Sequence, residues 1–254
     1  MPLKLTENAI RTHLNTPLNN VIAYTVIDST NSQAREFLAA GKKPPFLLVS
    51  EEQTAGRGRR GNSFFSPESG LYYTLVIKPD NTELAIQKTT LAAAVSTCEA
   101  IAETAGIECD IKWVNDLYLN GLKVADILCE APRNLQNEVM GIIIGIGINV
   151  SVREFPEELR GKAGSLNRPD LDRNQLAASL TDRLMHWTED LSNPELIAQY
   201  RRRSFLIGKN VSFVQNGKEI HGKAAGINDD GNLIIEAEET YVLSSGEVSL
   251  SSWK

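Results

Sequence analysis

The stretch QTAGRGRRGNSF, residues 53–64, constrains the fold more than any other short segment of the chain. Its glycines follow the pattern G-x-G-x-x-G from Gly56 to Gly61. In a dinucleotide-binding fold this pattern comes after a strand and opens a helix. Here the apolar run 45–53 predicts a strand before the loop, and 70–79 predicts a strand after it. The loop therefore connects two strands, which excludes a Rossmann fold.

Two further nucleotide-binding folds fail on their motifs. A protein kinase also has a glycine loop between strands, but no H-R-D or D-F-G motif follows in this chain. The P-loop pattern G-x-x-x-x-G-K-[ST] is absent as well. The loop chemistry nevertheless favours an anion, because glycines let backbone N–H groups come close and arginines bind phosphate or carboxylate in bidentate fashion. A solvated basic turn and an RNA-contacting segment are the alternatives.

The three arginines of the loop repel one another, and its glycines place few limits on the backbone conformation. We therefore expect the loop to be disordered until an anion binds and orders it.

Composition narrows the class of protein. The 254 residues carry a net charge of −6, which argues against broad nucleic-acid binding. The three cysteines show no CxxC spacing and the three histidines lie in unrelated segments, so no metal site is predicted. The N-terminus lacks a signal peptide, and the longest apolar run, 141–150, is about half a membrane span. We expect a cytoplasmic protein with no membrane association.

The order of predicted elements indicates an α+β fold. Up to about residue 205, strands alternate with helices, and Asn120-Gly121 marks a hairpin within 110–131. After that point only short strands and tight turns follow, which predicts a small antiparallel barrel or sandwich. We therefore predict two domains, 1–205 and 206–254. Helices are expected at 6–14, 31–41, 83–106, 173–191 and 194–204, and strands at 21–31, 45–53, 70–79 and 137–150.

Polar residues in apolar surroundings supply the candidate site. Ser29, Thr30 and Asn31 lie in the polar turn that ends the predicted strand 21–31. They form either a turn with a helix N-cap or a polar rim for an amide or urea group. Asn115 and Asp116 follow Trp113 in KWVND. Asp116 is either a turn residue or a carboxylate that holds or deprotonates an amine.

Two further features lie downstream. Lys123 lies within a mostly apolar strand. It is either an ordinary surface lysine or a point charge that binds a phosphate or a carboxylate. The glycines of GIGIN, residues 145–149, mark either tight helix packing or the close approach of a ligand.

Taken together, these motifs resemble the biotin protein ligase family. The resemblance runs from about Ile22 to the C-terminus and rests on DSTN, QTAGRGRRG, KWVND, LKVADIL and GIGINV in that order. It implies a class II synthetase-like catalytic domain with a mixed sheet, followed by a small SH3-like barrel. It also implies a reaction in two steps, in which biotin and ATP form biotinyl-adenylate and the biotin then passes to a lysine of a biotin carboxyl carrier protein.

The resemblance also implies roles for single residues. Arg59, Lys123 and Asp116 are expected to be catalytic, with magnesium on the phosphates and Asp116 accepting the proton of, or orienting, the acceptor lysine. The biotin-binding residues are expected to be Ser29, Thr30, Asn31, Gln53, Arg57, Gly58, Arg59 and Lys123. The residues expected to bind ATP and the adenylate are Arg57, Arg59, Phe64, Asn115, Lys123 and Asn149.

Three positions depart from the family pattern. Val114 replaces the proline of KWPND, where we expect a small effect. Phe64 replaces a tryptophan that stacks on adenine, and phenylalanine can still stack. Asp126 replaces a glycine, so that a carboxylate three residues from Lys123 either crowds the biotin site or pairs with the lysine.

The resemblance leaves partners and alternatives to test. About 20 residues precede the catalytic region, so we expect no DNA-binding domain and no repressor activity. A homodimer remains open. The alternative functions are a lipoate or octanoyl ligase of the same fold, a nucleic-acid binder that uses RGRR, and a homologue that binds biotin without transferring it.

Overall fold

The structure is a computed structural model that describes residues 3–78 and 85–250. Five α-helices, two short 3-10 helices and twelve strands follow one another along the described chain. The helices are α1 (Glu7–His13), α2 (Thr30–Ala39), α3 (Ala85–Ala105), α4 (Arg173–Glu189) and α5 (Pro194–Arg203), with 3-10 helices η1 (Arg59–Gly61) and η2 (Glu157–Leu159). The strands of the first sheet are β1 (Asn20–Ile27), β2 (Phe46–Gln53), β3 (Leu71–Ile77), β4 (Asp110–Lys112), β5 (Asp116–Leu119), β6 (Leu122–Glu130) and β7 (Ile142–Ile148).

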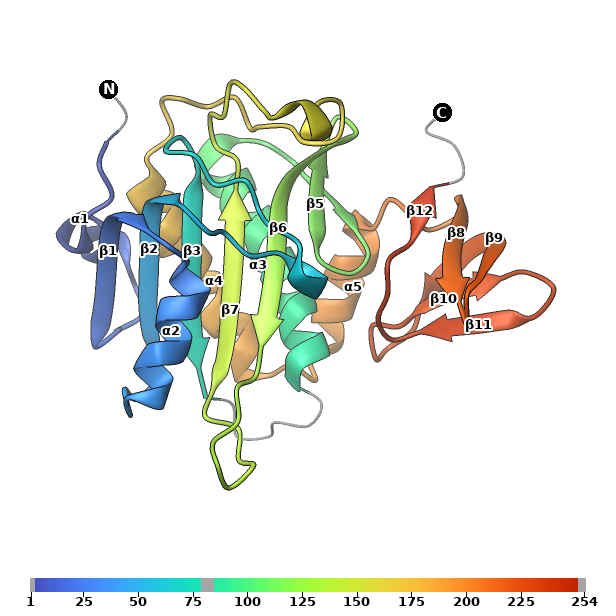
Figure 1. The fold of residues 1–254 in the computed structure, drawn as a ribbon, viewed down its shortest axis with the longest axis horizontal. Helices are drawn as coiled ribbons and strands as arrows, with labels where there is room; N and C mark the ends of the chain where they lie inside the picture. Colours follow the sequence, from blue (N-terminus) through green and yellow to red (C-terminus); the bar gives the residue numbers. More distant parts are fainter. Residues whose placement is uncertain (1–2, 79–84, 251–254) are drawn as a thin grey trace.

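The seven-stranded sheet has the order β1-β2-β3-β7-β6-β5-β4 (Figure 1). β1 and β2 pair in parallel, because α2 carries the chain from the end of one strand to the start of the other. The remaining neighbours pair antiparallel. The sheet is therefore mixed, which confirms the predicted α+β class with helices packed on a mixed sheet.

Helices cover both faces of this sheet. α2 lies in front of the sheet, and α3, α4 and α5 lie behind it (Figure 1). In β2, Leu47 and Val49 join the large core behind the sheet, whereas Phe46 and Leu48 join the small cluster under α2. Because successive strand residues face opposite sides, burial on both faces requires a continuous apolar run.

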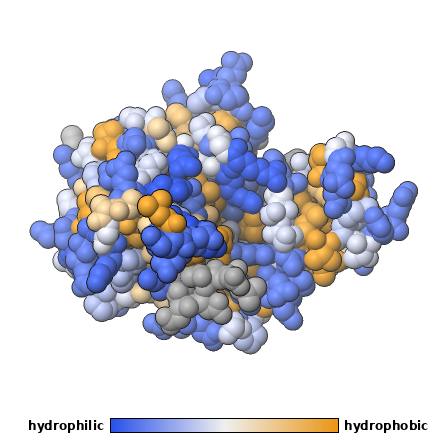
Figure 2. Space-filling view, turned by 60° about the horizontal axis from the view of Figure 1, so that its bottom comes forward, coloured by the Kyte–Doolittle hydropathy of each residue, from blue (hydrophilic) through white to orange (hydrophobic). Residues whose placement is uncertain are grey.

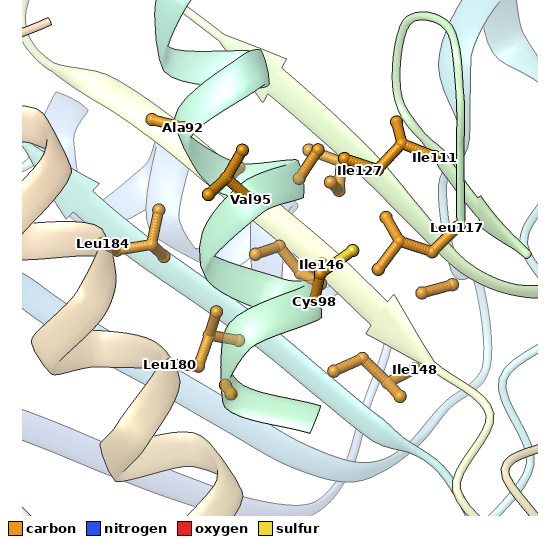
Figure 3. Packing of buried hydrophobic residues seen from close by; sticks show 14 of the residues in the cluster. Ala92, Val95, Cys98, Ile111, Leu117, Ile127, Ile146, Ile148, Leu180 and Leu184 are labelled. Carbon is orange, nitrogen blue, oxygen red and sulfur yellow. The ribbon is translucent and has the colours of Figure 1, made fainter. Parts of the chain in front are cut away.

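The large core lies where α3 is enclosed between α4 and the sheet. Cys98 of α3 lies beside Ile146 of β7, and Leu180 and Leu184 of α4 lie on the other side of α3 (Figure 3). All three cysteines are free thiols, two of them fully buried. Within the described residues, no helix is both long enough and apolar enough to cross a membrane.

The chain ends in a second, five-stranded antiparallel sheet with the order β11-β10-β9-β8-β12. Its strands are β8 (Asn210–Gln215), β9 (Lys218–Ile227), β10 (Leu233–Glu236), β11 (Thr240–Leu243) and β12 (Ser249–Leu250). It lies beside α5 and the β4–β5 end of the large sheet (Figure 1). Trp113 Nε1 donates a buried hydrogen bond of 2.9 Å to the main-chain oxygen of Gly231, which ties the two sheets together.

Most predicted elements are present, with bounds shifted by a few residues. Thr6 caps α1 and Ser29 caps α2. Asn120 and Gly121 form the predicted hairpin turn, with φ values of 51° and 78°. The sequence prediction missed β12, a pair of residues too short to show a period. The predicted start of the long helix at residues 83 and 84, and the predicted end of a strand at 79, lie outside the described residues.

The surface seen from below is mostly hydrophilic, and hydrophobic residues gather there only in small separate groups, one of them over the C-terminal sheet (Figure 2).

Candidate active site

Two neighbouring cavities lie on the front face of the large sheet, beyond the N-terminus of α2. The inner cavity lies over β3, β6 and β7, and the outer cavity lies between the 53–64 loop, the β4–β5 turn and the C-terminal segment. Both cavities are lined by Phe64 and Asp126, so these two side chains mark the place where they meet. The volume is about 20 Å³ for the inner cavity and about 140 Å³ for the outer one.

The inner cavity brings together residues from the start of α2, from the strands β2, β3, β6 and β7, and from the loop between β2 and β3. Predicted site residues make up part of its wall, and the rest comes from the sheet. The predicted ones are Ser29, Thr30, Asn31, Gln53, Arg57 and Phe64, and the sheet contributes Tyr72, Tyr73, Asp126, Leu128, Gly145, Ile146 and Gly147.

A network of neutral hydrogen bonds organises the inner cavity. Gln53 Oε1 accepts from the main-chain N–H of Thr30 at 2.8 Å and from its hydroxyl at 3.0 Å. Thr74 of β3 was not predicted; its Oγ1 lies 2.8 Å from Thr30 Oγ1 and 2.7 Å from Asn31 Oδ1. Ser29 accepts from the main-chain N–H of Ser32, as an N-cap does. The network fixes amide and hydroxyl groups in place, as recognition of a neutral polar ligand requires.

Two glycines of β7 make room for this network. Residues 143, 145 and 147 share the front face of the strand, and only Ile143 packs under α2. A Cβ on Gly145 would lie 2.1 Å from Asn31 Oδ1, and one on Gly147 would lie 2.3 Å from the ring of Phe64. Gly145 therefore leaves room for Asn31 of α2, in line with the helix-packing interpretation of GIGIN, and Gly147 leaves room for Phe64 of the loop; the close approach of a ligand stays a prediction.

Glu130, at the end of β6, connects the inner cavity to the arginine loop. It accepts from Arg35 of α2 at 2.6 Å and lies 3.5 Å from Arg57. It also accepts from Asn31 Nδ2 at 3.2 Å. Sequence analysis missed Glu130 because nothing near it in the chain marks it, and only the sheet brings it beside α2.

The outer cavity is the charged half of the site. Its wall includes the predicted residues Gly58, Arg59, Phe64, Asn115, Asp116 and Lys123, together with Arg60, Asn62, Ser63, Lys112, Trp113, Asp126, Gly246, Glu247 and Val248. The last three come from the C-terminal segment, where the sequence assigned no site residue.

Lys123 lies between two carboxylates. Its Nζ is 2.8 Å from Asp116 Oδ1 and also bonds Asp126 Oδ1. In a regular strand, residues 123 and 126 would face opposite sides, because their separation is odd. A β-bulge leaves Val124 without a partner on β5, so that Lys123, Asp126 and Asp116 share the front face. Asp126 thus pairs with the lysine, one of the two expected outcomes, and it also lines the inner cavity.

Burial and charge shift the pKa values of this pair. Burial raises the pKa of Asp126 to about 7, and the nearby Asp116 carboxylate adds to the rise while Lys123 opposes it. Burial alone lowers the pKa of Lys123, but the carboxylates of Asp126 and Asp116 together raise it above its ordinary value. Lys123 therefore remains a cation at every working pH.

Asn115 joins the arginine loop to this cluster. Its Oδ1 accepts from Arg59 Nη1 at 2.9 Å, and its Nδ2 donates to the main-chain oxygen of Ile127 at 3.0 Å and to Asp126 Oδ1 at 3.3 Å. Arg59 and Lys123 are thereby held at the same cavity, with a neutral amide and a carboxylate between them.

The loop itself has a defined conformation. Gly58 N–H donates to Asn62 O at 2.8 Å, and η1 forms the tip of the loop in front of the sheet (Figure 1). Arg57 turns toward Glu130 and Arg59 toward Asn115, so their charges diverge. Arg60 is exposed and left-handed, with φ 56°. The expected ordering of this loop by an anion stays a prediction.

Asn149 lies apart from both cavities. Its Nδ2 donates to Gly164 O at 2.9 Å, and its main-chain N–H donates to Val124 O at 2.8 Å. Its Oδ1 is buried without a hydrogen-bond partner among the described residues. The remaining predicted site residues all line one of the two cavities. The described residues contain no group of three or more His, Cys, Asp or Glu side chains arranged to hold a metal ion.

A mixed sheet thus carries a neutral polar cavity beside a charged one. Residues 23–149 match the biotin/lipoate A/B protein ligase family, and residues 206–251 match the biotin protein ligase C-terminal domain. The chain therefore belongs to the biotin protein ligase family.

Individual relatives agree. The chain is 34% identical to the bifunctional ligase/repressor BirA of Bacillus subtilis, over 94% of this chain and 76% of that protein. It is 31% identical to the biotin–[acetyl-CoA-carboxylase] ligase of Mycobacterium tuberculosis, over 90% of this chain and 87% of that protein. The solved structure of the Aquifex aeolicus biotin protein ligase in complex with biotin and ATP superposes with a TM-score of 0.77 and 28% identity, covering 93% of this chain and all of that one.

Proposed function

We propose that this protein is a biotin–[biotin carboxyl carrier protein] ligase, which activates biotin with ATP and transfers it to one lysine of its carrier. The observation that carries the proposal is the meeting of the two cavities at Phe64 and Asp126. A ligand that spans them has a neutral polar head in the inner cavity and a reacting anion in the outer one. Biotin, with its ureido ring and terminal carboxylate, has this shape and charge.

The inner cavity suits the biotin headgroup. Ser29, Thr30, Asn31 and Gln53 offer hydroxyl and amide groups that are held by one another and by Thr74. A ureido group needs both acceptors and donors, and amide side chains supply both. The small volume of the inner cavity means that its side chains or the arginine loop move to admit the ring.

The outer cavity suits the first chemical step. A biotin carboxylate oxygen attacks the α-phosphorus of ATP, and the bond to the β-phosphate breaks to release pyrophosphate. Two anions meet in this step, so fixed cations lower the barrier by offsetting their repulsion. Arg57, Arg59 and Lys123 supply those charges, with Gly58 giving backbone access and Phe64 an aromatic face for adenine. Asn115 positions Arg59. We keep Asn149 as an adenylate-binding candidate because its buried Oδ1 has an unused acceptor site among the described residues.

The second step transfers the acyl group. The neutral amine of the carrier lysine attacks the acyl carbonyl carbon, and AMP leaves with the electron pair of the broken C–O bond. The attacking amine has to lose a proton, and Asp116, which lines the outer cavity, is the carboxylate we assign to accept it or to orient the amine.

Magnesium is proposed to accompany the triphosphate. Among the side-chain oxygens that line the outer cavity, those of Asn115, Asp116 and Asp126 already bond Arg59 or Lys123. Magnesium in nucleotide sites commonly takes phosphate oxygens and water as its ligands. When bound, it supplies charge neutralisation at the phosphates, while the chain contributes the arginines and the lysine.

Finer features of the fold are part of the same proposal. We assign a class II synthetase-like catalytic domain to 1–205 and an SH3-like barrel to 206–254. The separate hydrogen bonding of the two sheets and the family match that begins at residue 206 support this division. We further propose that the enzyme works in the cytoplasm and does not bind DNA, and gel filtration will decide between monomer and homodimer.

Labelling of a carrier tests the function. The protein is mixed with ATP, magnesium, biotin and an apo carrier domain, and the carrier is probed for biotin. We expect labelling that depends on all four components. No labelling, while a known biotin ligase labels the same carrier in parallel, contradicts the proposal. Parallel reactions with lipoate and with octanoate in place of biotin test the alternative acyl ligase, because the matched family covers both activities.

The role of the loop has its own test. Arg59→Ala removes the guanidinium held by Asn115, and we expect a large loss of labelling. Labelling that survives this change unaltered contradicts the assignment of the loop. Biotin binding without transfer, seen by calorimetry, would identify a homologue with impaired activity.

A further inference from the structure

Asp126 places a carboxylate where the proposed reaction brings the carboxylate of biotin. Its side chain is 8% exposed, lines both cavities and bonds Lys123. A Cβ on Gly58 of the arginine loop would lie 3.7 Å from Asp126 Oδ2, so the carboxylate faces the loop as well as the lysine. It lies on the path between the two cavities rather than behind it.

The charges in this cluster do not balance when both acids are ionised. Lys123 carries one positive charge, and Asp116 and Asp126 carry one negative charge each. A substrate carboxylate that contacts Lys123 has to displace one of these acids and then lies beside an uncompensated anion. Like charges in a buried site disfavour simultaneous ionisation.

We propose, on the basis of the proposed function, that Asp126 is a positioning residue that competes with the biotin carboxylate for Lys123, so that biotin binds with uptake of one proton onto Asp126. With Asp126 neutral, the cluster has no net charge and Lys123 is released toward the substrate. With Asp126 ionised, the internal pair holds the lysine. Asp126 thereby sets both the affinity for the acyl substrate and its dependence on pH.

The environment of Asp126 supports a proton transfer near neutrality. Burial raises its pKa to about 7, far above the usual value of an aspartate. A second carboxylate bound beside it raises the pKa further, which is the condition for proton uptake on binding.

Charged and titratable groups from several elements face Asp126. Arg57 and Arg59 of the loop bring guanidinium groups to the two cavities. Burial raises the pKa of Tyr118 on β5 to about 12 and that of Tyr72 on β3 above its ordinary value, and the pKa of Lys123 on β6 is raised by its two carboxylates. Asp116 on β5 is the remaining close acid, while Lys112 of β4 and Glu247 of the C-terminal segment also line the outer cavity.

Calorimetric titration of biotin into the intact protein at pH 6 to 8.5 tests the proposal. We expect the Kd of the wild type to rise on the order of 10- to 30-fold over this range, since each pH unit above the pKa costs about tenfold. Titrations at pH 8.5 in two buffers of different ionisation enthalpy should give uptake of close to one proton. Asp126→Asn keeps the shape without the charge, so its Kd should vary less than threefold. Asp126→Gly, which removes the side chain, is the second variant and should behave in the same way.

A matched ligand separates the charge effect from a structural one. Biotinamide has the same headgroup without a carboxylate, and its Kd for the wild type should not depend on pH. In the overall reaction, Asp126→Asn should lower the KM for biotin at pH 8.5 and leave it nearly unchanged at pH 6.

The outcomes distinguish a failure of this inference from a failure of the proposed function. A wild type that binds biotin and labels the carrier, with a Kd constant across the pH range, overturns the role of Asp126 alone. Equal pH dependence in wild type and Asp126→Asn assigns the proton to another group, such as Asp116, and overturns it as well. A folded wild type that binds no biotin at any pH overturns the proposed function together with this inference.

Discussion

The inner and outer cavities hold their polar groups in place by different kinds of interaction. The inner cavity holds its polar groups in a network of neutral hydrogen bonds among Thr30, Asn31, Gln53 and Thr74. The outer cavity holds charges in place, with Lys123 between two carboxylates and Arg59 on Asn115. The hydrogen bonds of a neutral network contribute to affinity, whereas fixed charges act on the developing charge of a transition state. The two cavities should therefore respond to mutation in different kinetic parameters.

The largest effect is expected at the cation of the outer cavity. Lys123→Ala removes the charge next to the reacting carboxylate and should slow biotin-dependent pyrophosphate release by about 10²- to 10³-fold, from a barrier change of about 2.7–4 kcal/mol. Lys123→Arg is the matched control, because it keeps the charge while changing its geometry. If the alanine variant retains more than a tenth of the rate, the outer cavity is not the charged centre of the reaction.

The inner cavity should respond in KM. Thr30→Val removes a hydroxyl that bonds Gln53 and Thr74 and leaves a similar volume. A buried partner left unpaired costs about 1–3 kcal/mol, so the KM for biotin should rise by about 5- to 150-fold with kcat nearly unchanged. Thr30→Ser keeps the hydroxyl and should remain close to the wild type. A fall in kcat with constant KM would erase the distinction between the cavities.

A smaller effect concerns stability against pH. The pKa of Asp126 is raised in the folded protein, so the folded state binds the proton more tightly than the unfolded state does. The associated stability is present in full below the unfolded pKa and is lost as the pH rises through about 7. The wild type should therefore gain on the order of 2–3 kcal/mol over Asp126→Asn between pH 8 and pH 5, measured by urea unfolding. A constant difference between the two proteins would contradict the buried, raised state of this acid.

The smallest effect is expected at Arg60. Arg60 is exposed at the tip of the loop, and its left-handed conformation is one that asparagine also adopts. Arg60→Asn should change the labelling rate by about twofold or less, as surface substitutions generally do. The Arg59→Asn variant, measured in parallel, should show a much larger loss of the labelling rate. A large loss at Arg60 would extend the charged centre beyond Arg59 and Lys123.

The sequence located part of the inner cavity for a local reason. Ser29, Thr30 and Asn31 follow a strand and cap the next helix, so their position at the sheet edge is a property of neighbouring residues. Gln53 is the last residue of β2, which pairs in parallel with β1, the strand that precedes Ser29. Thr74 and Glu130 were missed, because each lies in a strand whose neighbours in the chain say nothing about α2.

The outer cavity depends on pairings between distant segments. The spacing of Lys123 and Asp126 predicts opposite faces of a strand, and the bulge at Val124 reverses this. The contribution of Gly246, Glu247 and Val248 requires the C-terminal sheet to lie beside the loop, a contact that no local pattern encodes. The departure of Asp126 from the family pattern was visible in the sequence, but whether it would crowd the site or pair with the lysine was not.

By itself, the sequence determined the order of helices and strands, the glycine–arginine loop between two strands and the family to which the chain belongs. These properties depend on short-range periodicity and on motifs, which residues close in the chain carry. The tertiary structure decided which face Lys123 occupies, which carboxylates surround it, and why Gly145 and Gly147 leave room for Asn31 and Phe64. These features depend on strand register and burial. The pKa of Asp126, for example, is set by neighbours that only the folded sheet brings together.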